Sequence, residues 1–177
     1  VSMDASSGDR VGRLLPVGEA AGTFIAVDHH ASFVPFAPVV HVDPSRPATG
    51  LLALDLIDQL GVKLTADMAM CLYAAISSDT GSFRFASTTP ETMRVAARLM
   101  DTGIDFSAAA KTMFDTRSLD FLALQADVMA GMELLANPAG TVAILRVPAA
   151  VRKQHEIAFT QVESLIDAVR TVEGAAV

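Results

Sequence analysis

The feature that most constrains this fold is a short apolar run that ends abruptly in one carboxylate and two imidazoles. Residues 24–27 are apolar and partly β-branched, which predicts a buried strand of a parallel sheet. Asp28, His29 and His30 follow at once. Ligand-binding residues of open α/β sheets lie just beyond the carboxyl ends of strands, so we expect a site here. For this motif alone, a capping aspartate followed by ordinary polar loop residues remains the alternative.

Two more acids occupy comparable places in the sequence. Asp4 follows a strand predicted at the start of the chain, although a turn or helix cap would also explain it. Asp79 lies in residues 77–85, whose small polar side chains and glycine predict a tight loop. Mixed carboxylate and imidazole ligands suit Mn²⁺ or a related divalent ion. Two such ions can share a bridging water and clamp a phosphoryl group for attack.

Three arginines and one cysteine need separate interpretations. Arg10, Arg46 and Arg84 lie near these acids in the sequence and could hold phosphate or carboxylate oxygens, although each alone could be an ordinary surface residue. Cys71 is the single cysteine, which excludes an internal disulfide and an all-cysteine zinc site. Its apolar helical surroundings predict a small core residue.

The rest of the sequence predicts alternating strands and helices up to about Arg117, and then one long connecting helix followed by a new strand. We expect strands at 39–42, 82–85 and 141–147, a turn at 137–140, and an exposed His155. We expect helices at 50–60, 65–77, 90–100, 105–115, 118–135 and 161–172. The first three helices would be capped by Thr49, by Thr65, and by Thr88 or Thr89. We therefore predict a domain at 1–116, a linker helix at 117–135 and the start of a second domain at 136–177.

Composition narrows the class of ligand. The chain has 177 residues, of which 51% are hydrophobic, and a net charge of -7 without a cluster of lysine or arginine. Extended binding to DNA or RNA needs a basic surface, so a long duplex is a poor ligand, whereas a small phosphorylated molecule held by a metal is compatible. No apolar run reaches the roughly 18 residues of a membrane span and no signal peptide is evident, so we expect a cytoplasmic protein.

Several separated motifs resemble one family. The DHH phosphoesterase superfamily, and within it the bacterial branch of nanoRNases and pAp phosphatases, is similar in its acid and arginine upstream, its central triplet, and two downstream stretches. In this sequence these are Asp4 with Arg10, Asp28-His29-His30, Asp43-Pro-Ser with Ala48-Thr49-Gly50, and Ser78-Asp79-Thr80-Gly81-Ser82-Phe83-Arg84. The resemblance implies an α/β fold: a Rossmann-like parallel sheet flanked by helices (the DHH domain), a linker helix, and the start of a smaller DHHA1-type domain.

The resemblance also implies a set of metal ligands. Asp4 would bridge two metal ions, and His29 and Asp79 would ligate the second ion. Asp28 would orient the two histidines without itself ligating a metal. The cofactor would be Mn²⁺, two ions in the intact site, with Mg²⁺ or Co²⁺ as alternatives. The family's first motif, a histidine followed by two aspartates, is expected before Val1, because both ends of the chain look cut.

Substrate contacts follow from the same resemblance. His30 would face the substrate phosphate, with Arg10 and Arg84 as further substrate-binding residues, and the catalytic set would be Asp4, His29, His30 and Asp79. The family's glycine-rich substrate-binding motif is expected after the last residue of the chain, so these 177 residues alone could be inactive.

The implied activity is metal-dependent hydrolysis of small nucleotides. The substrates would be short oligoribonucleotides, 3′-phosphoadenosine 5′-phosphate (pAp) or, as in some members, linear or cyclic dinucleotides. An inorganic pyrophosphatase, a single-strand exonuclease and a non-catalytic nucleotide-binding fragment are the alternatives. The expected partners are a small nucleotide or short RNA and a second copy of the chain in a homodimer, with no membrane.

Overall fold

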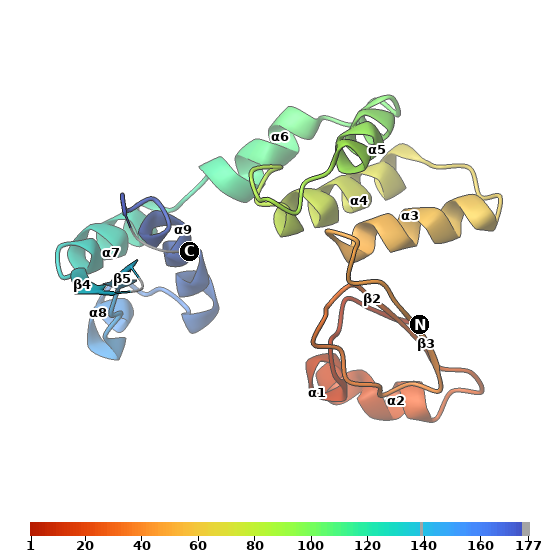
Figure 1. Cartoon of the computed structure of the whole chain (residues 1–177), viewed down its shortest axis with the longest axis horizontal. Helices are drawn as coiled ribbons and strands as arrows, with labels where there is room; N and C mark the ends of the chain where they lie inside the picture. The colour runs from red at the N-terminus through yellow and green to blue at the C-terminus, as the bar shows by residue number, and fades with distance from the viewer. Residues whose placement is uncertain (139, 175–177) are drawn as a thin grey trace. The chain divides into compact units, whose positions relative to one another are not determined.

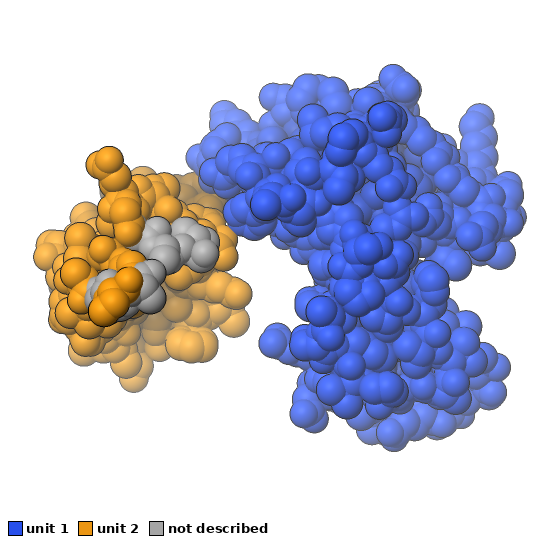
Figure 2. All heavy atoms as spheres, in the orientation of Figure 1, with its two compact units in different colours: residues 1–115 blue, residues 116–177 orange. Residues whose placement is uncertain are grey.

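The computed structural model describes residues 1–138 and 140–174, and its contacts divide the chain into two compact units (Figure 2). The first unit is residues 1–115 and the second begins at residue 116. Residue 139, inside the predicted turn 137–140, and the final apolar residues 175–177 lie outside the described residues. Each unit is described by itself.

A three-stranded parallel sheet opens the first unit. Its strands lie in the order β1 (Ser2–Met3), β2 (Ile25–Asp28) and β3 (Val39–Val42). Ala26 and Val27 in the central strand are buried, as the apolar run predicted. Because all three strands are parallel, their carboxyl ends meet at one edge, and the residues that follow β1 and β2 become neighbours.

Helices form the rest of this unit (Figure 1). They are α1 (Gly8–Val11), the 3₁₀ turn η1 (Gly12–Leu14), α2 (Leu15–Glu19), α3 (Thr49–Gln59), α4 (Ala66–Asp79), α5 (Pro90–Met100), α6 (Phe106–Ala110) and the π turn η2 (Lys111–Asp115). Helix α3 packs on α4, and α4 on α5. Their shared core contains Leu54, Leu72, Ile76 and Leu99, all buried. The α/β fold class, a parallel sheet flanked by helices, is confirmed.

Of the three helix caps that the sequence predicts, two are confirmed and one is wrong. Thr65 accepts a hydrogen bond from the Met68 amide, and Thr89 forms a reciprocal capping box at the start of α5, whose predicted bounds are confirmed. The prediction that Thr49 caps α3 is wrong, because Ala48 occupies the cap position and Thr49 is already helical. Its hydroxyl is used in the site described below.

The segment after α4 is a left-handed turn, so the predicted strand at 82–85 is wrong. Asp79 is the last residue of α4 and does not lie in a loop as expected. Gly81, Ser82 and Phe83 all have positive φ, at 56°, 58° and 62°. A Cβ on Gly81 would lie 2.4 Å from the Phe85 ring, so any other residue here would have to adopt the left-handed conformation and displace that ring.

The second unit has its own small core. It contains α7 (Leu119–Met129), an antiparallel hairpin of β4 (Glu133–Asn137) and β5 (Gly140–Ile144), then α8 (Ala149–Gln154), the 3₁₀ helix η3 (Phe159–Ser164) and α9 (Leu165–Val169). Phe121, Leu124, Val128, Ile157 and Leu165 form the buried cluster. The predicted helix 118–135 is therefore wrong beyond Met129, because a turn at Gly131 and strand pairing replace its last part. The predicted helix 161–172 is likewise wrong as one continuous helix.

Two single-residue predictions are also corrected. Cys71 is exposed and is not the core residue that its surroundings predicted. His155 is partly buried, and its Nε2 lies 2.7 Å from Asp127 Oδ2, so it is not the free surface residue expected. Among the helices that the structure describes, none combines the length and hydropathy that crossing a membrane requires.

Candidate functional site

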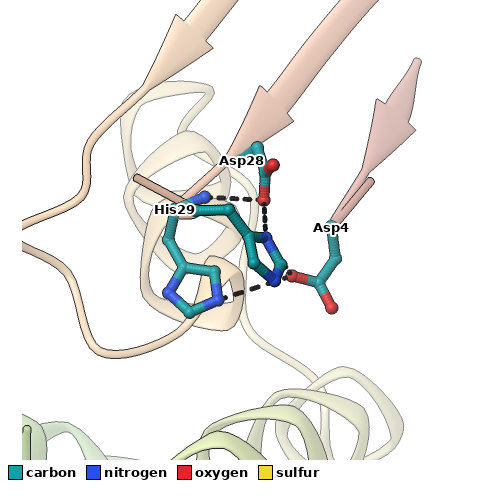
Figure 3. Close-up of side chains that lie close together, drawn as sticks. Asp4, Asp28 and His29 are labelled. Atoms are coloured by element: carbon teal, nitrogen blue, oxygen red, sulfur yellow. Dashed lines mark hydrogen bonds and ion pairs between the residues drawn. The ribbon is translucent and has the colours of Figure 1, made fainter. Parts of the chain in front are cut away.

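Two aspartates meet where β1 and β2 end (Figure 3). Asp4 follows β1 with a φ of 62°, a conformation that aspartate tolerates better than most residues. Its amide donates to the Val27 carbonyl at 3.0 Å, which extends the sheet pairing by one step and fixes the position of the residue. Asp28 ends β2 and is fully buried. The parallel pairing therefore produces the juxtaposition that the sequence predicted.

Asp28 organises the histidines through a single oxygen. Its Oδ1 accepts from the His29 amide at 2.8 Å and from His30 Nδ1 at 2.7 Å. The carboxylate hydrogen bond raises the pKa of His30, with the charges of Asp28, Asp4 and Asp79 acting in the same direction. The other oxygen, Oδ2, is buried and has no hydrogen-bond partner in the described part of the chain.

His29 lies between the two remaining acids. Its Nδ1 is 3.1 Å from the Arg46 carbonyl, and because a carbonyl only accepts, this nitrogen carries the proton in that contact. Its Nε2 lies 3.7 Å from Asp4 Oδ1 and 3.6 Å from Asp79 Oδ2. The ring thus presents one nitrogen to the backbone and the other to a pair of carboxylates.

Asp79 reaches the cluster from the C-terminal end of α4. Burial raises the pKa of its carboxyl group, the Asp4 charge adds to this increase, and His29 and His30 partly oppose it. Two carboxylates that repel each other across an imidazole are an arrangement that a cation would stabilise.

Thr49 belongs to the site, although the sequence analysis expected it as a helix cap and as part of the Ala48-Thr49-Gly50 motif, without a role among the acids. Its hydroxyl donates to Asp4 Oδ1 at 2.8 Å and lies 3.5 Å from Asp28 Oδ1. The hydroxyl therefore links the carboxylates at the ends of the two strands. No sequence signal identifies this role, because it depends on the strand pairing that brings Asp4 to Asp28.

The three arginines are not equivalent. Arg10 on α1 and Arg84 are both exposed, and Arg84 Nε donates to the Gly81 carbonyl at 2.7 Å. Within the part of the chain that the structure describes, no hydrogen bond or ion pair joins either of them to the cluster. Arg46 instead donates to Asp55 and Glu91, so acids of the protein already hold its guanidinium.

The donor set fits a divalent metal ion. One ligand atom each from Asp4, Asp28, His29 and His30 lies within 4.8 Å of the others. Asp79 also lies beside this group, because its carboxylate Oδ2 is 3.6 Å from His29 Nε2. Ligand bonds of about 2.0–2.2 Å place neighbouring donor atoms roughly 3–3.5 Å apart. The contacts of His29 Nε2 with Asp4 and with Asp79, at 3.7 and 3.6 Å, are each only slightly longer than that spacing. Hard carboxylate oxygens with imidazole nitrogen are ligands suited to such an ion.

A cavity of about 250 Å³ adjoins the cluster. Asp4, Asp79 and Thr49 line its polar side, and apolar side chains such as Ala53 and Leu72 line the rest. The acids thus face a space between α3 and α4 large enough for a small group.

Similar proteins share both the sequence and the fold. No protein-family model matches the sequence. The bifunctional oligoribonuclease and PAP phosphatase NrnA of Thermus thermophilus is 44% identical over 105 residues, which cover 59% of this chain and 31% of that protein. A probable NrnA of Streptococcus mutans is 31% identical over 118 residues, 67% of this chain and 38% of that protein. The chain therefore spans about a third of these curated relatives.

A solved structure agrees over a longer range. An exopolyphosphatase-related protein from Bacteroides fragilis has a TM-score of 0.85 and covers 96% of this chain and 50% of that one, at 21% identity. At that identity the likeness establishes the fold alone. The sequence relatives and the motifs show that this chain belongs to the DHH phosphoesterase family, in the branch of the bifunctional oligoribonucleases and PAP phosphatases.

Proposed function

We propose that the protein is a metal-dependent phosphohydrolase of small nucleotides, acting on short oligoribonucleotides and on pAp. Membership of this phosphoesterase family supports hydrolysis of a phosphoester, and the names of the curated relatives support the substrate class. The observation that carries the proposal is the position of His29 Nε2 between Asp4 and Asp79 at the strand ends. In the same proposal, the second unit is the start of the substrate-binding domain.

Each side chain of the cluster has a separate role in this proposal. Asp4, His29 and Asp79 would hold Mn²⁺, with Asp4 shared between two ions in the complete site. A metal bound there would lower the pKa of a water molecule and neutralise phosphate charge. Asp28 holds both histidines in place through Oδ1. His30, whose pKa is raised by that contact, would donate from its other ring nitrogen to a phosphate oxygen.

A comparison of two aspartates tests the assignment. Asp4→Asn in the full-length protein should reduce hydrolysis of a short RNA by at least about 100-fold at saturating Mn²⁺, because an amide replaces a carboxylate that would ligate the metal. Asp67→Asn is the control, since Asp67 is an exposed acid in the first turn of α4, away from the cluster. Activity of the Asp4 variant within a few-fold of wild type would refute the proposal, as would unchanged activity of the wild type after chelation.

A further inference from the structure

The ring orientation of His29 depends on a backbone carbonyl whose own position must be held. His29 Nδ1 donates to the Arg46 carbonyl at 3.1 Å, so Nε2 is the nitrogen that faces Asp4 and Asp79. The two acids favour the opposite tautomer, because an Nε2–H could donate to either of them. The carbonyl is the contact that opposes this, and a shift of the loop that carries it would release the ring.

Arg46 fixes that loop with its own side chain. Its guanidinium donates to Asp55 of α3 at 2.7 Å and to Glu91 of α5 at 2.6 Å, and its Nε lies 3.8 Å from Asp43. Two acids on different helices thus hold one planar group from two sides. The planar guanidinium offers a separate nitrogen to each acid, whereas a lysine would have to reach both acids with one ammonium group.

Local hydrogen bonds hold the backbone on either side of this loop. The Asp43 amide donates to the Asp28 carbonyl at 3.0 Å, which ties the loop to the end of β2. Asp43 Oδ1 accepts from the Ser45 amide at 3.0 Å and from the Ser45 hydroxyl at 2.6 Å, and the Arg46 amide donates to the Asp43 carbonyl at 3.2 Å. The backbone before Arg46 is therefore fixed by the sheet, and its side chain by the helices.

We propose that Arg46, held by Asp55 and Glu91, is a positioning residue that sets the tautomer of His29 and keeps Nε2 free to ligate a metal. It acts through its carbonyl and the rigidity of its loop, and it does not touch the substrate. The tautomer of His29 is set in the metal-free protein, whereas its consequence for metal binding rests on the proposed function.

The chain offers a matched control. Arg98 on α5 donates twice to Asp58 on α3, both at 2.6 Å, so it also joins these helices through a guanidinium. The contacts of Arg98 lie far along α3 from the loop that precedes this helix. Arg98→Ala therefore removes a bridge of the same chemistry without touching the carbonyl that His29 uses.

The test combines ring spectroscopy with metal titration. In ¹⁵N-histidine-labelled, metal-free protein, at a pH where the ring is neutral, His29 should be the Nδ1–H tautomer in the wild type and in Arg98→Ala. Arg46→Ala should show a mixture or the Nε2–H form. By calorimetry, Mn²⁺ should bind about tenfold or more weakly to Arg46→Ala, and within about twofold of wild type to Arg98→Ala.

Each result decides the matter. An Nδ1–H ring in Arg46→Ala would overturn the inference, and so would an equal change in Arg98→Ala. If the tautomer changes as expected but the wild type binds no Mn²⁺, the positioning role stands and the proposed function fails. If Arg46→Ala does not fold, Glu91→Ala removes one side of the bridge from an exposed position and should shift the tautomer in the same direction.

Discussion

At the scale of single residues, the two histidines differ in what holds Nδ1. His29 donates to a neutral carbonyl, whereas His30 contacts the buried carboxylate of Asp28. A carboxylate stabilises the imidazolium form and raises the pKa of His30, while a carbonyl fixes the tautomer without adding charge. In the proposed function, the His29 ring would ligate the metal and the His30 ring would carry a proton.

This difference predicts separable losses on mutation. His29→Ala should weaken Mn²⁺ binding by about tenfold or more, because it removes a ligand. His30→Ala should leave the metal stoichiometry intact and mainly reduce kcat. Metal content and steady-state kinetics of both purified variants check this, and an equal loss of metal from the two variants would show that the roles are wrong.

At the scale of elements, the turn after α4 determines where Asp79 points. Three successive left-handed residues follow the helix, and the Thr80 hydroxyl, fully buried, donates to the Ile76 carbonyl at 2.7 Å and accepts from the Phe83 amide at 3.1 Å. The turn thereby closes the helix one residue beyond the acid.

Gly81→Ala should show what this turn contributes to stability. Positive φ costs alanine about 1–2 kcal/mol, and a Cβ 2.4 Å from the Phe85 ring would also force that ring to move. Gly61→Ala is the control, because Gly61 has a φ of 65° and a Cβ there meets nothing within 4 Å. Urea unfolding should rank Gly81→Ala as clearly the less stable; equal free energies would mean that the ring moves aside freely.

The burial of Asp79 predicts a pH-dependent effect in the metal-free protein. Its raised folded pKa means that folding favours the protonated form, so its contribution to the free energy of unfolding is greatest below the ordinary carboxyl pKa. That contribution is lost as the pH rises through the folded value. With chelator present, Asp79→Asn should therefore raise the Tm at neutral pH and match the wild type at acid pH. A lower Tm at neutral pH would contradict this.

Regular elements were predictable where the chemistry is local. The strand before Asp28 and the helix beginning at Pro90 follow from adjacent residues, and the structure has both. The helix expected through 118–135 failed because the pairing of β4 with β5, a contact between segments, outweighed helical periodicity. The bridging hydroxyl of Thr49 and the carbonyl of Arg46 could not be predicted, since each acts on a residue far away in the sequence.

At the scale of the whole molecule, the net charge predicts how substrate affinity depends on salt and how turnover depends on RNA length. A protein with a net charge of -7 that binds through metals and a few directed contacts releases few counterions, so its affinity should depend weakly on salt. Turnover should also be highest on RNAs of a few nucleotides. A series of labelled RNAs from two to roughly two dozen nucleotides, assayed at low and high salt, checks both. Rates that climb with length and fall steeply with salt would indicate a single-strand exonuclease.

The two buried clusters share no residue: one lies among α3, α4 and α5 of the first unit, the other around α7 and α9 of the second. All proposed metal ligands belong to the first unit. The hydrogen bonds that hold Asp28, His29 and His30 are likewise made by residues of the first unit, so residues 1–115 encode the geometry at the strand ends.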